Sequence, residues 1–512
     1  MKKIIDKFII KEYKFKYLIF SIISGILIAI PFKSFNFYLL AWSAFIPLIY
    51  CIYKNNLKYS VLYGFVTGIT FALISFDWMF LFLLENTKFL ITSLIMALIL
   101  WLYISMYFTF WSVIVNFIKK LRALYVIVFA ACLWASFEYI RNYFFTGFPI
   151  NLLGYSQAFF LPIIQFSDIF GVYGISFLIV LINMLFFYWF YKKEKKYLLC
   201  AIIILLCLTL FGFFKINKYS NINNQNSLKI GVVQPNIVQY KKNKQNFVEE
   251  IKGILLEASK CFSNKNIDIL AYPETVLPAR LQVDEDMQKV IKQIASVAKI
   301  TLIGGKYHRF IRLYNAIFLI SQEGNIINKY KKKHLILFGE TVPFENMFVR
   351  TLRILNLSDS FSKEEVLKVF EFDNYTLGIN ICSENYYPYL SRELVLKGAT
   401  LLTTHSNDSW CDGLSYPNQH FVLNVFRAIE NRKYLIVAAN TGISGVIAPS
   451  GKIIKQTKNQ EQVCFEENVY TNNYITIYDI IGDIFVCFCM AYVILILLFY
   501  GIFVKKYIKV RA

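Results

Sequence analysis

Three short segments of this sequence each place a reactive side chain at the end of an apolar, strand-like run. They are DILAYPETVLP around Glu274, KYKKKHLILFGE around Lys332 and GINICSENYYP around Cys382. A carboxylate, an ammonium group and a thiol can act as base, oxyanion stabiliser and nucleophile. The three segments therefore indicate the chemistry of acyl transfer through a cysteine.

Each of these residues also has an ordinary structural explanation. A lone cysteine such as Cys382 is usually a small buried residue, and a glutamate after a strand often caps the following turn. The run KKK at 331–333 is typical of a solvated basic loop, and position alone does not choose among its three lysines. The apolar run before Glu274 is nevertheless expected to raise the pKa of its carboxyl group, which suits proton transfer.

Two further carboxylates lie close to these segments in the sequence. Glu340 follows HLILFG, which we interpret as a strand, and Glu384 comes two residues after Cys382. Either could support the reactive groups or form a structural ion pair.

The part of the chain that carries these residues alternates strand-like and helix-like stretches. Strands are expected at SLKIGVVQPN, IDILAYPE, TLIGGKYH, NAIFLIS, YTLGINIC, ATLLTTHSN and YLIVAAN, and amphipathic helices at NFVEEIKGILLEASKCF and MQKVIKQIASVAKI. The turns in SQEGNII and APSGKII predict two hairpins. We expect a layered α/β domain over 225–483, after a polar linker at about 218–227.

The rest of the chain is too apolar for a soluble protein. Of the 512 residues 57% are apolar and 18% aromatic, and long hydrophobic runs of this kind can cross a bilayer. Seven precede the α/β segment and one follows it, at about 17–32, 37–53, 59–84, 89–117, 123–140, 171–191, 197–214 and 484–504. The expected organisation is a seven-helix membrane domain over 1–217, the α/β domain, a transmembrane helix over 484–504 and a basic cytoplasmic tail over 505–512.

The charges of the loops predict an orientation. Positive residues gather in the N-terminal tail, in alternate loops and in the C-terminal tail: Lys2, Lys3, Lys7, Lys11, Lys14, Lys16; Lys54, Lys58; Lys119, Lys120, Arg122; Lys192, Lys193, Lys195, Lys196; Lys505, Lys506, Lys509, Arg511. By the positive-inside rule both termini are cytoplasmic, and seven crossings then deliver the α/β domain to the outer side. PFKSF after the first run offers no small-residue cleavage site, so we interpret that run as an uncleaved anchor.

The net charge of +21 falls largely in these juxtamembrane clusters, which suits anionic lipid headgroups better than nucleic acid. Cys261, Cys382, Cys411 and Cys464 belong to the α/β domain, and nothing in their spacing selects a disulfide pair. The four histidines show no zinc-site spacing, so no metal is expected.

The segments together resemble a known family. The α/β segment is similar to the nitrilase superfamily, and the whole chain resembles the bacterial apolipoprotein N-acyltransferases. The matching stretches are EYIRNYFFTGFPINLLGYSQ and GVYGISFLIVLIN in the membrane part, and VVQPNI, YPE, HLILFGETVPFE, ICSE, SNDSW, RAIENRKYLIVAANTGISGVIAPSGK and TIYDIIGD in the remainder. The resemblance implies an α-helical transmembrane bundle plus a nitrilase-like αββα sandwich domain.

The family's catalytic positions map onto single residues. Its glutamate falls on Glu274 in YPE, and its nucleophile falls on Cys382. Its lysine stands two residues before the histidine of KxHLxxFGE, which selects Lys332. Its further carboxylates fall on Glu340 and Glu384, and the oxyanion stabilisers implied are Lys332 and the backbone N–H of residue 383.

Three positions depart from the family pattern. The residue after the nucleophile, often aromatic, is Ser383; a tryptophan about nine residues after the Gln of VVQP is missing, where the sequence is YKKNKQ; and an arginine three residues before the Asn of ANTG is Val437. These departures bear on lipid or acceptor contacts and leave the Glu–Lys–Cys set intact.

The resemblance implies an activity and its partners. The acyl donor would be a membrane phospholipid, and the acceptor the free α-amino group of a lipoprotein's diacylglyceryl-cysteine. The acyl chain would pass through a thioester on Cys382 in a ping-pong sequence, without a cofactor. We expect a monomer in the bacterial inner membrane, with the catalytic domain periplasmic.

Other interpretations of the chain stay open at this stage. A membrane-tethered amidase or nitrilase-type hydrolase would keep the same residues and use water as acceptor. A transporter with an inactive enzyme-like domain would use charges such as Asp77 and Glu138 inside the spans. The aromatic segment 141–170 is expected to lie at the membrane interface and admit acyl chains, or else to pack as a re-entrant segment.

Overall fold

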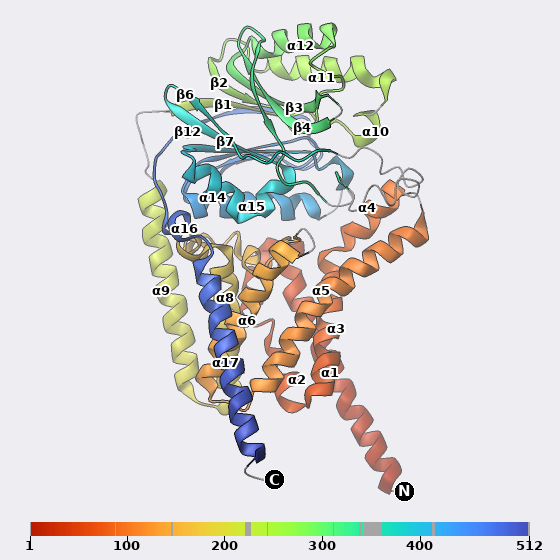
Figure 1. Ribbon diagram of the computed structural model, residues 1–512, viewed down its shortest axis with the longest axis vertical. Coiled ribbons are helices and arrows are strands. Elements are labelled where there is room, and N and C mark those ends of the chain that lie inside the picture. Colours follow the sequence, from red (N-terminus) through yellow and green to blue (C-terminus); the bar gives the residue numbers. More distant parts are fainter. Residues whose placement is uncertain are drawn as a thin grey trace. The chain divides into compact units, whose positions relative to one another are not determined.

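The computed structural model describes residues 2–87, 89–144, 147–220, 227–242, 244–310, 312–336, 340–341, 361–411 and 415–509. Its chain divides into two compact units (Figure 1). The first contains Met1–Phe213 with Ile481–Ala512, and the second contains Phe214–Ile480. Residues 221–226 of the expected linker and 510–512 of the expected basic tail lie outside the described residues.

The first unit is built from helices. They are α1 Lys2–Lys33, η1 Phe35–Trp42, α2 Ile46–Lys54, α3 Leu57–Ser75, α4 Asp77–Thr87, α5 Leu90–Ile118, α6 Ala123–Tyr143, η3 Leu153–Gln157, α7 Leu161–Ile164, α8 Ser167–Lys192, α9 Lys195–Ser220 and α17 Ile484–Lys509. Within the described residues, eight helical segments are long and apolar enough to cross a membrane, seven before the second unit and one after it. These helices match the eight expected apolar runs in number and order.

Two of the spans differ from the predicted ones in detail. The run 59–84 was predicted as one helix, but α3 ends at Ser75 and α4 begins at Asp77. The break falls where a charge enters the apolar run, and Asp77 forms an ion pair with Lys33. The second span begins as the 3-10 helix η1 and continues as α2 rather than forming one α-helix.

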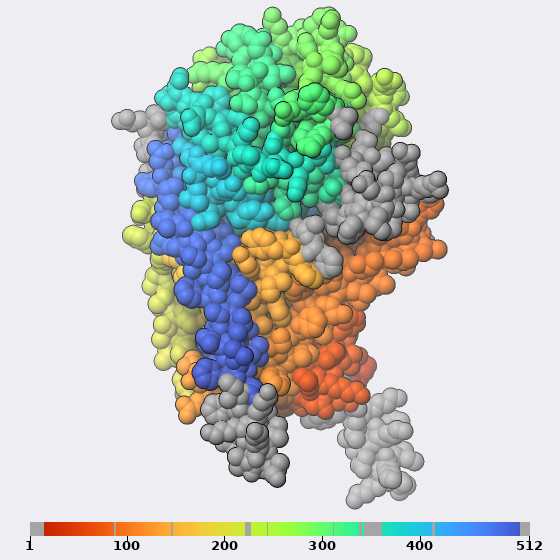
Figure 2. Space-filling model, in the orientation of Figure 1, coloured from red at the N-terminus to blue at the C-terminus, as the bar shows by residue number. Residues whose placement is uncertain are grey.

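Small residues allow α3 to pack closely against α5. A Cβ atom added to Gly64 would lie 2.7 Å from Ser112 Oγ, and one added to Gly68 would lie 2.6 Å from Ser105 Cα. Such close approach is how membrane helices gain van der Waals contact without a hydrophobic driving force. By contrast, α17 exposes Phe488, which is typical of a helix that faces lipid; Figure 2 shows this helix in blue.

The segment 141–170 is mostly packed inside the first unit. Residues 149–158 are buried. Gln157 accepts a hydrogen bond from Trp42 Nε1 at 2.8 Å, and the Leu153 N–H donates to Glu138 Oε1 at 2.7 Å. These contacts favour the re-entrant packing interpretation over an interfacial position for 149–158, while Phe159 is exposed.

The second unit contains two six-stranded sheets. The first has the order β12-β1-β2-β3-β4-β5 and the second β11-β10-β9-β8-β7-β6. The strands are β1 Ser227–Gln234, β2 Ile267–Ala271, β3 Ala298–Arg309, β4 Arg312–Ser321, β5 Ile326–Lys331, β6 Val369–Phe372, β7 Tyr375–Ile381, β8 Leu401–Ser406, β9 Leu435–Ala439, β10 Gly445–Ile447, β11 Ile453–Gln456 and β12 Val463–Tyr470. At the centre of each sheet three strands run parallel: β1, β2 and β3, and β7, β8 and β9.

Helices cover the outer faces of the two sheets. Figure 1 shows α11 Val248–Lys260 and α12 Glu285–Ala295 beyond the first sheet, and α14 Pro388–Leu396 and α15 Tyr416–Asn431 beyond the second. The four layers form the expected αββα sandwich. The shorter helices are α10 Gln239–Lys242, η4 Gln245–Phe247, η5 Cys382–Tyr386, η6 Ser409–Cys411 and α16 Ile477–Ile481.

The expected strands and hairpins are present, with three corrections. The second predicted helix ends at Ala295, because the following AKI begins β3. HLILFG is not a strand over its described part, 334–336; the strand β5 lies just before it and ends at Lys331. Two strands were not predicted: β6, which pairs antiparallel with β7, and β12, which pairs antiparallel with β1.

A disulfide joins two of the cysteines whose pairing the sequence left open. Cys261 follows the end of α11 and is bonded to Cys464 in β12, with the two Cα atoms 6.6 Å apart. Among the described residues, Cys382 and Cys411 are buried and take part in no disulfide. The bond therefore ties a helix of the first layer to the edge strand of its sheet.

Candidate active site

Several polar residues follow the carboxyl ends of the parallel strands. Glu274 comes three residues after β2, Cys382 directly after β7, and Asn407 and Asp408 directly after β8. Neighbouring parallel strands end at the same edge of a sheet, where loops are free to carry chemistry. β7 and β8 are neighbours in the second sheet and β2 belongs to the first, so the packing of the two sheets brings Glu274 to the others, up to 134 positions away in the sequence.

Cys382 occupies a strained position. It opens η5 with a backbone φ of +48°, and its side chain is 2% exposed. A residue with a Cβ atom in this left-handed region costs about 1–2 kcal/mol, and such strain concentrates at functional sites because the surrounding fold must enforce it. Ser383 is the next residue of η5, and the first N–H groups of a helix have no partner inside it.

Glu274 is held from three sides. Its Oε1 accepts hydrogen bonds from Asn315 Nδ2 at 2.6 Å and from Lys332 Nζ at 3.2 Å, and its Oε2 accepts from the Asn407 N–H at 3.0 Å. The side chain is buried. Both carboxylate oxygens are therefore fixed in orientation.

The loop of Glu274 can approach β3 because of a glycine. A Cβ atom at Gly304 would lie 2.4 Å from Pro273 O and 2.6 Å from Glu274 Cα. The Gly304 N–H donates to Pro273 O at 3.0 Å, and the Val276 N–H donates back to Gly304 O at 3.0 Å. Any side chain at this position would move the carboxylate.

Lys332 lies directly after β5 and is 1% exposed. Its Nζ lies 3.2 Å from Glu274 Oε1 and 2.9 Å from Glu340 Oε1. Burial acts to lower the pKa of Lys332, but the two carboxylates outweigh it and raise the pKa above its ordinary value. The side chain is thus a fixed cation at neutral pH.

The neighbouring lysines point to other partners. Lys331 pairs with Glu364, and Lys333 lies 3.4 Å from Glu393. Among the three lysines of this run, only Lys332 contacts Glu274, so the geometry makes the choice that the residues alone left open.

Glu340 and Asn315 complete the contacts around the ammonium group. Asn315 Nδ2 donates to Glu340 Oε1 at 2.9 Å as well as to Glu274, and the Lys332 N–H donates to Asn315 O at 2.9 Å. The other oxygen of Glu340 accepts from the Ile336 N–H at 3.0 Å. Glu340 therefore contacts both the side chain of Lys332 and the backbone of Ile336.

Glu384 connects the cysteine turn to the lysine loop. It is fully buried, and its carboxylate accepts from the Ile381 N–H at 2.7 Å, the Lys333 N–H at 2.7 Å and Tyr330 Oη at 3.0 Å. Burial raises its pKa to about 7, although these hydrogen bonds from backbone N–H groups act in the opposite direction. Glu384 holds Cys382 and Lys332 in a fixed relation through their neighbours.

Burial and the nearby charges together set the pKa of the Cys382 thiol. Burial raises the pKa of the thiol well above its ordinary value, the negative charge of Glu274 raises it further, and Lys332 acts to lower it. The thiol is therefore protonated at neutral pH, and it requires a base before it can act as a nucleophile.

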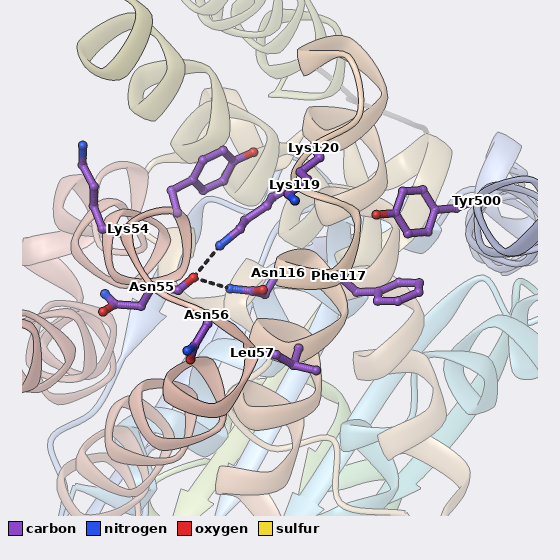
Figure 3. Close-up of a pocket in the computed structure, with 10 residues that line it drawn as sticks. Lys54, Asn55, Asn56, Leu57, Asn116, Phe117, Lys119, Lys120 and Tyr500 are labelled. Atoms are coloured by element: carbon purple, nitrogen blue, oxygen red, sulfur yellow. Dashed lines mark hydrogen bonds between the residues drawn. The ribbon is translucent and has the colours of Figure 1, made fainter. Parts of the chain in front are cut away.

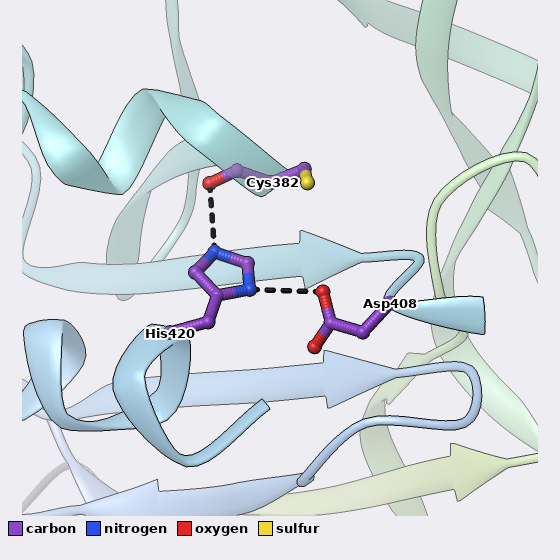
Figure 4. A group of neighbouring side chains, drawn as sticks. All are labelled: Cys382, Asp408 and His420. Atoms are coloured by element: carbon purple, nitrogen blue, oxygen red, sulfur yellow. Dashed lines mark hydrogen bonds and ion pairs between the residues drawn. The ribbon is translucent and has the colours of Figure 1, made fainter. Parts of the chain in front are cut away.

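Asp408 and His420 also lie close to Cys382 (Figure 4). His420 Nδ1 lies 2.9 Å from Asp408 Oδ1, and its Nε2 lies 3.3 Å from the backbone oxygen of Cys382. Both partners are acceptors, so the ring makes both hydrogen bonds only when both nitrogens carry a proton. The side chains of the three residues lie close enough, within 4.8 Å, to ligate one ion, but both imidazole nitrogens are already engaged, so we assign no metal here.

Comparisons with known proteins fit this arrangement. Residues 24–185 match the family model described as the apolipoprotein N-acyltransferase N-terminal domain, and residues 229–467 match the carbon-nitrogen hydrolase model. The apolipoprotein N-acyltransferase of Geobacter metallireducens is 30% identical over 92% of this chain and 92% of its own. The chain belongs to the apolipoprotein N-acyltransferase family.

One further relative and one solved structure are also similar to this chain. Apolipoprotein N-acyltransferase 1 of Treponema denticola is 27% identical over 96% of this chain and 97% of its own. Among solved structures, Nit3 of Saccharomyces cerevisiae, a member of branch 10 of the nitrilase superfamily, covers 48% of this chain and 90% of its own, with 17% identity and a TM-score of 0.37. Because it belongs to this family, the protein is a multi-pass membrane protein and an acyl-transferring enzyme.

Several residues that contact the predicted site in this family member were not found from the sequence. Asn315 lies inside the strand-like run NAIFLIS, and Tyr330 precedes the three lysines without any distinguishing pattern. Asp408 lies in SNDSW, a segment that carried the resemblance, so its place beside Cys382 could have been suspected. His420 gave no signal, because its partners come from two other segments.

Proposed function

We propose that this protein transfers a fatty acyl chain from a membrane glycerophospholipid to the α-amino group of the N-terminal S-diacylglyceryl-cysteine of lipoproteins, the last step of their maturation. The observation that carries the proposal is the alignment, over 92% of both chains, with a relative named for N-acyl transfer to apolipoproteins. The buried contacts of Glu274 and Lys332 beside a strained cysteine support it chemically.

In the first half-reaction the protonated thiol of Cys382 gives its proton to Glu274, and the thiolate attacks the acyl ester carbonyl of the phospholipid. Lys332 and the backbone N–H of Ser383 stabilise the negative oxygen of the tetrahedral intermediate. The ester C–O bond then breaks, and Glu274 returns the proton to the leaving oxygen. A lysophospholipid departs and a thioester remains on Cys382.

In the second half-reaction the neutral α-amino group of the lipoprotein attacks the thioester carbonyl. Glu274 takes one proton from the attacking nitrogen, and the same donors stabilise the oxyanion. The C–S bond breaks, the thiolate of Cys382 recovers the proton from Glu274, and the acyl chain is left in an amide. The enzyme returns to its starting protonation without a cofactor.

The supporting carboxylates act by position. Glu340 keeps the ammonium group of Lys332 aimed between two carboxylates, and Glu384 keeps the turn of Cys382 against the lysine loop. Several donors hold each of these carboxylates in place, because a misplacement of a reacting group by about 1 Å can cost two orders of magnitude in rate.

The catalytic unit belongs on the periplasmic side of a bacterial inner membrane, with both termini cytoplasmic. The alternation of positive loops supports this orientation. The Cys261–Cys464 disulfide supports it independently, because disulfides persist in oxidising compartments such as the periplasm.

Product analysis tests the proposal. The purified full-length protein is incubated with a phospholipid labelled in its acyl chain and with a synthetic peptide that begins with S-diacylglyceryl-cysteine. We expect a labelled amide, none from Cys382→Ala, and none from a matched peptide whose α-amino group is acetylated. Release of labelled fatty acid without amide would refute N-acyl transfer and favour the membrane-tethered hydrolase.

A further inference from the structure

The first unit contains a cavity at one end of its helices, far in sequence from the acyl-transfer residues. Its volume is about 490 Å³, within the range of small-ligand sites. Its walls come from the end of α2, the start of α3, the last turn of α5 with the residues after it, and α17 (Figure 3). The residues that carry its charge are Lys54, Lys119 and Lys120.

The positive charge in this cavity is not balanced. None of the residues that line it is acidic. The ammonium group of Lys54 lies 5.2 Å from the ring centre of Tyr191 and 5.7 Å from that of Tyr50, contacts that leave its charge in place. None of the residues that line the cavity beside Lys120 offers it a carboxylate. The cavity therefore presents a net positive field to whatever enters it.

Lys119 is affected both by its burial and by the neighbouring positive charge. Its Nζ donates to Ile52 O at 2.8 Å and to Asn55 O at 2.5 Å, two carbonyls at the carboxyl end of α2. Figure 3 shows the bond to Asn55. Burial lowers the pKa of Lys119, and the charge of Lys120 lowers it further. A bound anion would remove this repulsion, whereas a cation or a neutral ligand would not.

The position of the cavity matches that of a lipid phosphate. It lies at the ends of the apolar spans Phe35–Lys54, Leu57–Ser75 and Leu90–Ile118, where the hydrocarbon gives way to headgroups. Two of its lining side chains, Leu57 and Phe117, are apolar and exposed. Amine groups beside apolar surface at this depth suit an amphipathic anion, since basic pockets between membrane helices bind phospholipid headgroups.

We propose that this cavity binds the phosphate headgroup of an anionic phospholipid, with Lys54 and Lys120 as its charge partners and Lys119 as a structural cation that fixes the cavity wall. Phosphatidylglycerol is the simplest probe of this chemistry. The site is separate from the acyl-transfer chemistry, so it does not depend on the proposed function.

Native mass spectrometry of the detergent-solubilised full-length protein tests the proposal. The lysine pair is removed in Lys54→Gln/Lys120→Gln, and a matched control removes two exposed charges, at the end of α8 and the start of α9, in Lys192→Gln/Lys195→Gln. A lysine near a lipid phosphate contributes roughly fivefold in affinity, so the cavity variant should bind phosphatidylglycerol about thirtyfold more weakly than wild type. The control variant should bind as wild type does.

The remaining outcomes distinguish the alternatives. Equal loss in both double variants would mean general electrostatic adsorption, and equal binding of phosphatidylcholine would mean that the charge is irrelevant; either overturns the proposal. Displacement of the lipid by millimolar inorganic phosphate would identify a site for free anions and overturn the lipid source. A matching melting temperature in both variants excludes misfolding as the cause of a loss.

Discussion

In the proposed mechanism Lys332 neutralises two carboxylates and stabilises the oxyanion, and one series of substitutions can separate these two roles. In Lys332→Met, the carboxylates of Glu274 and Glu340 lose their shared cation. Both Oε1 atoms lie on the same Asn315 nitrogen, at 2.6 and 2.9 Å, so they are less than about 6 Å apart and repel by about 3 kcal/mol at an effective dielectric constant of about 20. We expect Lys332→Met to be destabilised by about 3–5 kcal/mol, as when a buried ion pair loses one partner.

The double variant Lys332→Met/Glu340→Gln removes that repulsion without restoring the cation. It should recover about 3 kcal/mol of stability relative to Lys332→Met and still form no acyl-enzyme, because Glu274 keeps its charge but the oxyanion lacks its ammonium partner. The assays are thermal unfolding in detergent at one scan rate and mass spectrometry of Cys382 after exposure to phospholipid. A double variant no more stable than the single one would refute the electrostatic reasoning, and acylation in either would refute the role of Lys332.

Further predictions address other contacts of the site. Gly304→Ala should abolish acyl transfer by displacing Glu274, whereas Gly305→Ala, whose added Cβ atom meets only side chains at 3.0 Å or more, should retain most of it; equal activities would contradict the positioning role. The pKa of Glu384 is raised to about 7, so its stabilising contribution is full below about pH 4.5 and is lost as the pH rises through 7; pH-dependent unfolding should lose this trend in Glu384→Gln, and an unchanged trend would be evidence against it. His420→Ala should lower kcat more than it changes KM, and it should change the pH profile of the activity. His420→Gln should partly restore kcat, because it keeps a donor for the Cys382 carbonyl. A loss of stability with unaltered kinetics would mean a purely structural role.

The sequence carried more information about the reactive residues than about what holds them. Glu274 and Cys382 each follow an apolar run, a local pattern that is visible without a structure, whereas Lys332 was selected only by the resemblance to the pattern KxHLxxFGE. Asn315 is a polar residue inside a strand, and its contacts with Glu274 and Glu340 arise only when β4 lies beside the lysine loop. A non-local contact of this kind leaves no trace in local composition.

The fold shows the same division between local and non-local signals. Helical spans and parallel strands follow from long apolar runs and their periodicity. The edge strand β12 mixes acidic and apolar residues, so its pairing with β1 across more than two hundred positions could not be predicted, and neither could the Cys261–Cys464 bond that it carries. Asp77, at the start of the helix after the break, pairs with Lys33 on another helix, and local sequence does not reveal this partner.

The central claim is that the acyl chain passes through a thioester on Cys382. The most direct test is mass spectrometry of the intact protein after incubation with phospholipid and no acceptor, beside Cys382→Ala. The account predicts a hydroxylamine-labile acyl adduct on Cys382, absent from the variant and released when a diacylglyceryl peptide with a free α-amino group is added. An adduct that persists in Cys382→Ala, or lysophospholipid release without any adduct, would contradict it.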